Sequence, residues 1–222
     1  MDKQPLSERV ADDIQEMIIS QKYLVGERLA NEFELAEELK VGRNTIREAI
    51  KLLASKNIVE IRRGKGTFVS ERPGLIDDPL GLSFLSNQAF LSADLLEVRQ
   101  IIEPAIAKLA ARNRTSENIE EMLASCLAVE EAIALGKNHT EEDMLFHTAI
   151  AKGTQNQVIP NLIPIIHSSI SAFIEETNNV LKQETITTHR EILAAIKSGS
   201  EEQAEVAMKE HLRINAELIK AK

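Results

Sequence analysis

The segment Val41–Ile50, VGRNTIREAI, decides the fold of the N-terminal part of this chain. If it is helical, Arg43 and Arg47 are four residues apart and lie on one face. The opposite face would be buried and would hold Val41, Ile46, Ala49 and Ile50. A helix that exposes arginine, asparagine and threonine near its start is typical of a recognition helix in a DNA major groove. The candidate DNA-binding residues here are Arg43, Asn44, Thr45 and Arg47.

The charge pattern favours binding of a polyanion by this segment. The 222-residue chain has a net charge of −9, yet residues 1–72 hold 13 basic and 13 acidic residues and are neutral. Within residues 40–66 there are eight basic residues against two acidic ones. Because salt screens distant charges, these nearby cations matter most to a bound nucleic acid.

The surrounding sequence predicts a winged helix-turn-helix. Residues 7–20 begin with Ser7 as an N-cap and carry an apolar stripe, and residues 32–39 predict a short second helix before the helix 43–55. Two β-branched runs, 58–61 and 67–69, flank a basic connection that contains glycine, which is typical of a β-hairpin. The hairpin tip adds three candidate DNA contacts, Arg63, Gly64 and Lys65.

The rest of the chain predicts a second domain made of helices. We expect a winged-helix domain at 1–72, a linker of turn-forming residues at 73–82 and an all-helical bundle at 83–222, so that the fold class is mainly α. Helices are expected at 92–113, 116–135, from Thr140 onward, and at 157–181, 184–198 and 201–220. The expected buried stripe of the first one consists of Leu95, Leu96, Val98, Ile101, Ile102, Ala105 and Leu109.

Composition excludes several classes of protein. Cys126 is the only cysteine, so no disulfide forms within the chain and a reducing compartment is expected. We interpret Cys126 itself as a small buried apolar residue. No apolar run approaches the roughly 18 residues that a membrane span needs, and the first residues lack the core of a signal peptide. We therefore expect a cytoplasmic protein that does not enter a membrane.

Histidines of the helical domain form the second strong pattern. Asp143 and His147 are four residues apart and project from one helix face, whereas His189 and His211 lie among apolar neighbours on two later helices. Three neutral imidazoles and one carboxylate suit a divalent transition metal such as Zn²⁺, Ni²⁺ or Mn²⁺. The same spacing is common on solvated helices, so from the residues alone a metal site is one of two interpretations.

Three other residues of this domain need an interpretation. Arg99 either forms a surface ion pair with Glu103 or turns into the bundle to bind a ligand carboxylate. His167 is either a core or cavity-lining histidine or a ligand. His139 lies in a polar loop, and we expect it to be exposed to solvent.

No arrangement of catalytic residues is apparent in the sequence. It has no phosphate-binding loop and no GxSxG elbow, and Cys126 has no evident histidine partner. A metal-dependent hydrolase would need an open coordination position and a carboxylate base, and nothing singles out Glu142 for that role. Such a hydrolase is the remote alternative, and we expect no enzyme.

These motifs resemble the GntR family of bacterial transcription regulators, in its FadR-like branch with an all-helical FCD effector domain. The resemblance covers essentially the whole chain. In the N-terminal part it is carried by LVGERL at 24–29, ELA at 34–36, RNTIREA at 43–49 and GKGTFV at 64–69. In the C-terminal part it is carried by EVR at 97–99, Glu103, DMLFH at 143–147, His189 and His211.

The resemblance implies a homodimer whose winged helices bind a palindromic operator in double-stranded DNA. Arg43 and Arg47 would contact bases or phosphates, and Arg63 with Gly64 would reach the minor groove. One divalent transition metal per subunit would be held by Asp143, His147, His189 and His211. A small organic acid would complete the coordination of the metal and control a repressor, with the metal itself as the alternative signal. The candidate effector-binding residues are Arg99 and His167.

Two positions depart from the pattern of the family, in which Pro-Ser-Glu-Arg-Glu-Leu-Ala usually precedes the recognition helix. Here the segment is Ala30–Ala36, and Phe33 replaces an arginine that often contacts DNA. Gly42 replaces the serine or threonine that usually precedes the first recognition arginine. We therefore expect an operator that differs from the commonest half-site, with reduced base discrimination or affinity.

Overall fold

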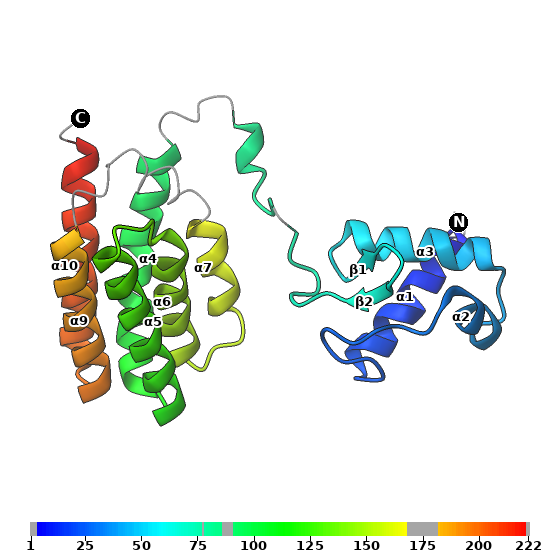
Figure 1. Cartoon of the computed structure of the whole chain (residues 1–222), viewed down its shortest axis with the longest axis horizontal. Coiled ribbons are helices and arrows are strands. Elements are labelled where there is room, and N and C mark those ends of the chain that lie inside the picture. The colour runs from blue at the N-terminus through cyan, green and yellow to red at the C-terminus, as the bar shows by residue number, and fades with distance from the viewer. Residues whose placement is uncertain (1–3, 77, 86–90, 168–181, 221–222) are drawn as a thin grey trace. The chain divides into compact units, whose positions relative to one another are not determined.

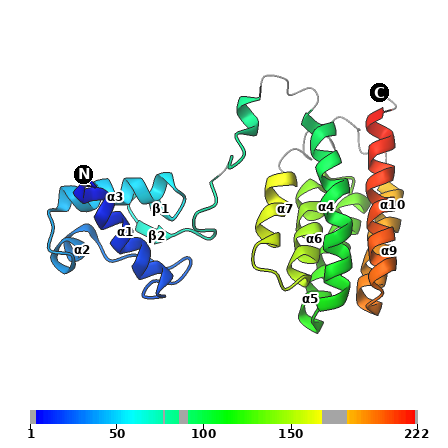
Figure 2. The same ribbon diagram turned by 180° about the vertical axis from the view of Figure 1, so that it is seen from behind.

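The computed structural model describes residues 4–76, 78–85, 91–167 and 182–220 and divides the chain into two compact units (Figures 1 and 2). The boundary lies between Pro79 and Leu80, inside the segment expected to be a linker. Each unit has a hydrophobic core of its own. Within the described ranges, no helix is long and apolar enough to cross a membrane.

The N-terminal unit is a winged helix-turn-helix. Its elements are α1 (Leu6–Ile19), α2 (Glu32–Glu38), α3 (Arg43–Ser55), β1 (Val59–Arg62) and β2 (Gly66–Val69). Helices α1 and α2 both pack against α3, whose Ile46 and Ala49 are 0% exposed, so the predicted inward face is confirmed. Helix α1 begins at Leu6, because the Pro5 carbonyl accepts the first helical hydrogen bond, from the Arg9 N–H; the expected N-cap role of Ser7 is wrong.

Local hydrogen bonds fix the start of α2. The Asn31 side chain accepts bonds from the N–H groups of Phe33 and Glu34 at 2.9 and 3.0 Å. The Glu34 carboxylate accepts in return from the Asn31 N–H at 2.8 Å, which completes a capping box. Helix α3 starts after Gly42, which occupies its N-cap position.

The hairpin is an antiparallel pair that runs from Val59 opposite Val69 to Arg62 opposite Gly66. The chain around Arg28 adds a third extended segment to it, through an isolated bridge to Phe68. Gly66 has φ +117°, and a Cβ atom built there would lie 2.6 Å from Nε of Arg28. A glycine is therefore needed at the point where the arginine crosses the hairpin.

The C-terminal unit is a helical bundle. Its helices are α4 (Leu91–Asn113), α5 (Ser116–Ala134), α6 (Thr140–Gly153), α7 (Ile159–His167), α9 (Lys182–Ser198) and α10 (Glu201–Lys220), preceded by the short 3₁₀ turn η1 (Leu82–Phe84). Both views show these long helices side by side, and α4 contacts α6, α7, α9 and α10. The predicted helix 157–181 is described only as far as His167; its remainder lies outside the described residues.

The buried face of α4 differs from the expected one. Val98 and Ile101, expected inside, are 40% and 69% exposed. The face that packs inward holds Leu95, Leu96, Arg99, Glu103, Ile106, Ala107 and Ala110. The buried face of α4 includes two charged residues, Arg99 and Glu103. A prediction from apolar residues alone therefore placed the buried face partly on the wrong side of the helix.

Candidate metal centre and DNA-binding surface

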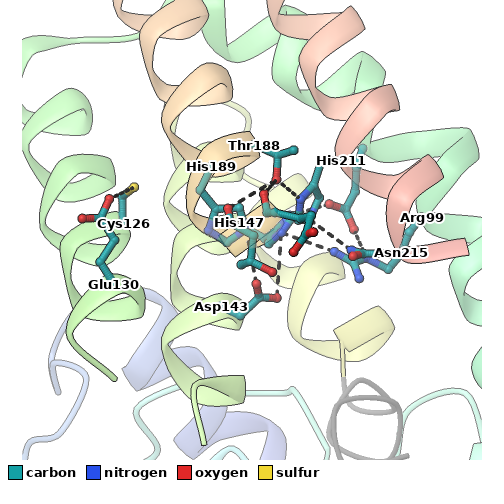
Figure 3. Close-up of polar contacts among 12 residues, drawn as sticks. Arg99, Cys126, Glu130, Asp143, His147, Thr188, His189, His211 and Asn215 are labelled. Atoms are coloured by element: carbon teal, nitrogen blue, oxygen red, sulfur yellow. Dashed lines mark hydrogen bonds and ion pairs between the residues drawn. The ribbon is translucent and has the colours of Figure 1, made fainter. Parts of the chain in front are cut away.

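Three helices bring the candidate metal ligands together in the C-terminal unit (Figure 3). Asp143 and His147 come from α6, His189 from α9 and His211 from α10. All four are buried, with exposed fractions between 1% and 6%. One nitrogen from each histidine lies within 4.8 Å of the others. The Asp143 oxygens lie 3.3 Å from Nε2 of His189 and 3.9 Å from Nε2 of His147.

The electrostatics of the cluster favour the protonation states that a metal requires. Burial lowers the pKa of His189, and burial together with the neighbouring histidines holds the pKa of His211 well below its usual value. Burial opposes ionisation of Asp143, but the ring of His189, 3.3 Å away, together with His147 and Arg99 holds its pKa well below the ordinary range. Neutral imidazoles and an ionised carboxylate are the forms that bind metal ions.

The donor set fits a first-row transition metal. With metal–nitrogen bonds of about 2.1 Å, two nitrogens on one ion are at most about 4.2 Å apart. The histidine nitrogens lie within 4.8 Å, so small side-chain rotations would bring them into range. Imidazole nitrogen suits Zn²⁺ and Ni²⁺, whereas Ca²⁺ and Mg²⁺ prefer oxygen ligands.

Arg99 and Glu103 on α4 border this cluster and are not a surface pair. They are 3% and 1% exposed, so the surface interpretation of both residues is wrong. Arg99 Nε donates to Glu103 Oε1 at 2.6 Å, and Arg99 Nη2 lies 3.3 Å from His147 Nε2. Glu103 Oε2 lies 2.5 Å from His147 Nδ1. Their spacing of three and seven residues from Leu96 was a signal that could have placed them inside.

The sequence did not predict three other residues of this site. Thr188 Oγ1 lies 2.9 Å from Nδ1 of His211, and Asn215 Nδ2 lies 3.3 Å from Nε2 of the same ring. The ring of Phe146 stacks on His189 with 4.3 Å between centroids. The four-residue spacing of His211 and Asn215 was an available signal, whereas nothing in the sequence distinguishes Thr188 from Thr187.

The other residues considered from the sequence lie outside this cluster or outside the description. His167 is the last residue of α7, and its side chain is not among those described. His139 is 5% exposed at the N-cap position of α6, so its expected exposure to solvent is wrong. Cys126 is 2% exposed, as predicted, and lies with Glu130 away from the histidines (Figure 3). Burial raises the pKa of its thiol to about 11.

The candidate DNA contacts lie on two segments of the N-terminal unit. At the start of α3, Arg43 and Asn44 are exposed and Thr45 is half-buried. The hairpin-tip residues Arg63, Gly64 and Lys65 are all exposed. A cavity of about 260 Å³ is bordered by Arg63 of the tip and by Glu32 at the start of α2. Glu32 in turn contacts Arg47 of α3, so the hairpin tip and the recognition helix border neighbouring parts of one surface.

Two arginines of this surface are held by carboxylates. Arg47 donates from Nε and Nη2 to the two oxygens of Glu32, at 3.2 and 2.8 Å. This hydrogen bonding lowers the pKa of Glu32. Arg62 donates to Glu60 at 3.0 and 3.2 Å and lies over the ring of Phe68. Neither pair was predicted from the sequence.

Comparisons with known proteins assign both units. The family model described as bacterial regulatory proteins, gntR family, matches residues 6–69, and the FCD domain model matches residues 94–214. The Uxu operon transcriptional regulator of Escherichia coli is 33% identical over 214 residues, which cover 90% of this chain and 80% of that protein. The galactonate operon transcriptional repressor of the same organism is 30% identical over 211 residues, which cover 90% and 91%.

A solved structure agrees with these matches. The structure of a Streptococcus agalactiae GntR protein superimposes with a TM-score of 0.82 at 36% identity, covering 95% of this chain and 99% of that one. The matched families consist of DNA-binding transcription regulators and not of enzymes, which leaves the hydrolase alternative without support. The chain therefore belongs to the GntR family of bacterial transcription regulators, in the FadR-like branch that carries a helical FCD domain.

Proposed function

We propose that this chain is a dimeric repressor whose operator binding is controlled by a small carboxylate held at a metal ion in the C-terminal unit. The observation that carries the proposal is the buried cluster of Asp143, His147, His189 and His211 beside Arg99. A divalent ion and Arg99 would bring three positive charges against the two negative charges of Glu103 and Asp143. A monoanion such as a carboxylate would neutralise the remaining charge, which is costly to leave buried.

Different residues of the chain would bind the metal ion and the carboxylate. Asp143 and the three histidines would hold the ion, which when bound offers a Lewis-acidic position for a carboxylate oxygen. Arg99 would donate from its remaining N–H groups to the same carboxylate, since its Nε is occupied by Glu103. His167 remains a candidate effector contact. A relative named for the galactonate operon favours a sugar acid or similar hydroxy acid as the effector.

We place the operator contacts on α3 and on the hairpin tip. Arg43, Asn44, Thr45 and Arg47 would meet base edges or adjacent phosphates in a major groove. Arg63, Gly64 and Lys65 would contact phosphates or the minor groove. Two copies of the chain would read the two halves of a palindrome. Phe33 is 64% exposed and cannot supply an arginine contact, so an operator that departs from the commonest half-site remains the expectation.

A DNA-binding titration with and without acid and metal tests this proposal. The native chain is titrated onto labelled DNA from upstream of its own gene at fixed salt, with galactonate or other hydroxy acids present, with or without Zn²⁺ or Ni²⁺. We expect tenfold weaker binding when acid and metal are both present, which corresponds to about 1.4 kcal/mol of coupling. Sedimentation of the same sample should show a dimer.

Two variants assign the effect to the residues named. Arg47→Ala should weaken operator binding and lower the salt slope by about one if Arg47 neutralises a phosphate. His147→Ala should abolish the response to acid and leave operator binding intact. If acid releases the DNA equally well without metal, the proposed role of the metal is contradicted. If transcription in vitro rises when the chain binds the operator, the proposed repressor role is contradicted.

A second candidate function makes the metal itself the signal. Asp143 and the three histidines can supply four ligands, which is enough to close a tetrahedral site without any acid. In that case chelation and re-addition of the ion would switch operator binding in the absence of carboxylates. A metal that only raises the unfolding temperature would instead be structural.

A further inference from the structure

The hydrogen bonds of Thr188 indicate which nitrogen of His211 carries a proton. Thr188 is 4% exposed, and its hydroxyl donates to the backbone carbonyl of Glu184 at 2.9 Å. The carbonyl of Thr185 lies 3.3 Å from the same hydroxyl, and carbonyl oxygens only accept, so we place the single hydroxyl proton of Thr188 toward these two backbone oxygens. With that placement Oγ1 accepts from His211 Nδ1, 2.9 Å away, and Nδ1 carries the proton. In the neutral ring, Nε2 of His211 then has the lone pair, which the Asn215 amide faces at 3.3 Å.

The contacts of His147 lead to the same tautomer by a different route. Arg99 Nη2 lies 3.3 Å from Nε2 of His147, and a guanidinium has only donors, so Nε2 must be the acceptor. Glu103 Oε2 lies 2.5 Å from Nδ1, and an ionised carboxylate has only acceptors. The contact with Glu103 is an ion pair and does not have the geometry of a hydrogen bond, so the bond from Arg99 carries the assignment of the lone pair to Nε2. A carboxylate beside Nδ1 favours a proton on that atom.

We propose that Glu103 and Thr188 are positioning residues that fix the Nδ1–H tautomers of His147 and His211 and so direct two Nε2 lone pairs to the metal. This inference rests on the metal site of the proposed function. An acceptor on the second ring nitrogen fixes the orientation of a metal-binding histidine and raises its basicity. The two acceptors come from different helices, Glu103 from α4 and Thr188 from α9.

His189 is oriented in another way. Its ring stacks on Phe146, with 27° between the ring planes. Among the described residues, its Nδ1 has no hydrogen-bond partner. The tautomers of His147 and His211 should therefore respond to changes at Glu103 and Thr188, whereas the tautomer of His189 should not.

Matched variants of the full chain test the two residues separately. Thr188→Val keeps the shape of the side chain and removes the acceptor. Its control is Thr187→Val, because exposed Thr187 makes the same type of bond, to the carbonyl of Gln183 at 2.9 Å. Glu103→Gln offers His147 both a donor and an acceptor, so it tolerates either tautomer. Its control is Glu97→Gln, an exposed carboxylate on the same helix.

Two measurements are made on each variant. Nitrogen-15 NMR of the chelator-treated protein reports the tautomer of each histidine, and competition with a chromophoric chelator reports the affinity for Zn²⁺. We expect Nδ1–H at His147 and His211 in the native chain. Thr188→Val should change the tautomer of His211 alone. Because Arg99 still donates to Nε2 of His147 in Glu103→Gln, the tautomer of His147 should change only in Arg99→Met/Glu103→Gln. Each loss of an acceptor should weaken Zn²⁺ binding by about 10–100-fold. The controls should match the native chain.

Several results would overturn the inference. These are a proton on Nε2 of either ring in the native chain, an unchanged tautomer of His211 in Thr188→Val or of His147 in Arg99→Met/Glu103→Gln, or an equal loss of Zn²⁺ affinity in the controls. If Glu103→Gln does not fold because it leaves Arg99 unpaired, the double variant Arg99→Met/Glu103→Gln removes both charges and replaces it. Failure of the native chain to bind Zn²⁺ would contradict the proposed metal role. The NMR spectra of the chelator-treated chain test the Nδ1–H tautomers of His147 and His211 independently of that result.

Discussion

At the scale of single residues, Glu32 bears directly on how this chain would read DNA. It holds the guanidinium of Arg47 in a two-bond fork across α2 and α3. The two side chains are 43% and 54% exposed, and pairs of this kind contribute at most about 1 kcal/mol to stability. The role of the pair is therefore geometric, because it limits Arg47 to one orientation and keeps a negative charge beside the candidate DNA-binding surface.

Replacing Glu32 with glutamine should reduce sequence discrimination. Removal of the carboxylate frees Arg47 and lowers repulsion of phosphates, so affinity for random duplex DNA should rise several-fold at low salt. Affinity for the operator should rise less or fall. Anisotropy titrations with both duplexes measure the ratio. Glu48→Gln is the control, because it removes the same charge from a pair with Lys51 on α3; an equal change in the ratio would contradict the role of Glu32.

Cys126 should be nearly inert in the folded chain. Its thiol has a pKa of about 11, because burial and the nearby carboxylate of Glu130 disfavour the thiolate. At pH 8 only about one thiol in a thousand would be ionised, and the thiolate is the reactive form. Alkylation by iodoacetamide, followed by mass spectrometry, should be far slower in buffer than in urea. Equal rates in the two conditions would show that the thiol is accessible.

The candidate site shows how far the sequence could be read at this scale. Asp143, His147, His189 and His211 were predicted as one group, and the structure brings them together because helix spacing and apolar neighbours placed each on an inward face. The contacts of Arg99 and Thr188 could not be predicted. They depend on which helices pack side by side, and the sequence does not encode that pairing locally.

At the scale of elements, the capping box of α2 links helix stability to the DNA surface. Asn31 caps a helix of only seven residues, and the next residue, Glu32, holds Arg47. Asn31→Ala should lower the free energy of unfolding of the N-terminal unit by about 1 kcal/mol, whereas Asn31→Ser should restore most of it. Urea unfolding followed by NMR signals of this unit measures both. Equal stability of the two variants would contradict the capping role.

The elements themselves were predicted more accurately than their faces. Helix α3 spans Arg43–Ser55 as expected, because its stripe of Ile46, Ala49 and Ile50 is uninterrupted by charge. Helix α4 has nearly the expected limits, but the exposed Ile101 was assigned to its buried side. Apolar periodicity indicates the inward face only where the buried stripe is apolar, and the buried charged residues Arg99 and Glu103 break that rule on α4.

At the scale of the whole molecule, control of operator binding by an effector requires a coupling between two units that each have their own core. Such a coupling is a free energy shared by the two binding events and not a property of either site. Each binding event can be altered by its own substitution, because Arg47 belongs to the DNA-binding unit and His147 to the C-terminal unit.

Thermodynamic reciprocity gives the last prediction. If the acid weakens operator binding tenfold, the operator must weaken acid binding tenfold, because both factors measure the same coupling free energy. Calorimetric titration of the acid into the metal-loaded chain, alone and saturated with operator, measures how much the operator weakens acid binding. The conditions should be those in which the effect of the acid on operator binding is measured. Arg47→Ala is the control, since at an operator concentration that saturates only the native chain, this weaker-binding variant should show nearly the same acid affinity with and without DNA. Unequal factors would mean that the acid removes the metal or binds at a second site, and the proposed route from the buried carboxylate to the operator would then be wrong.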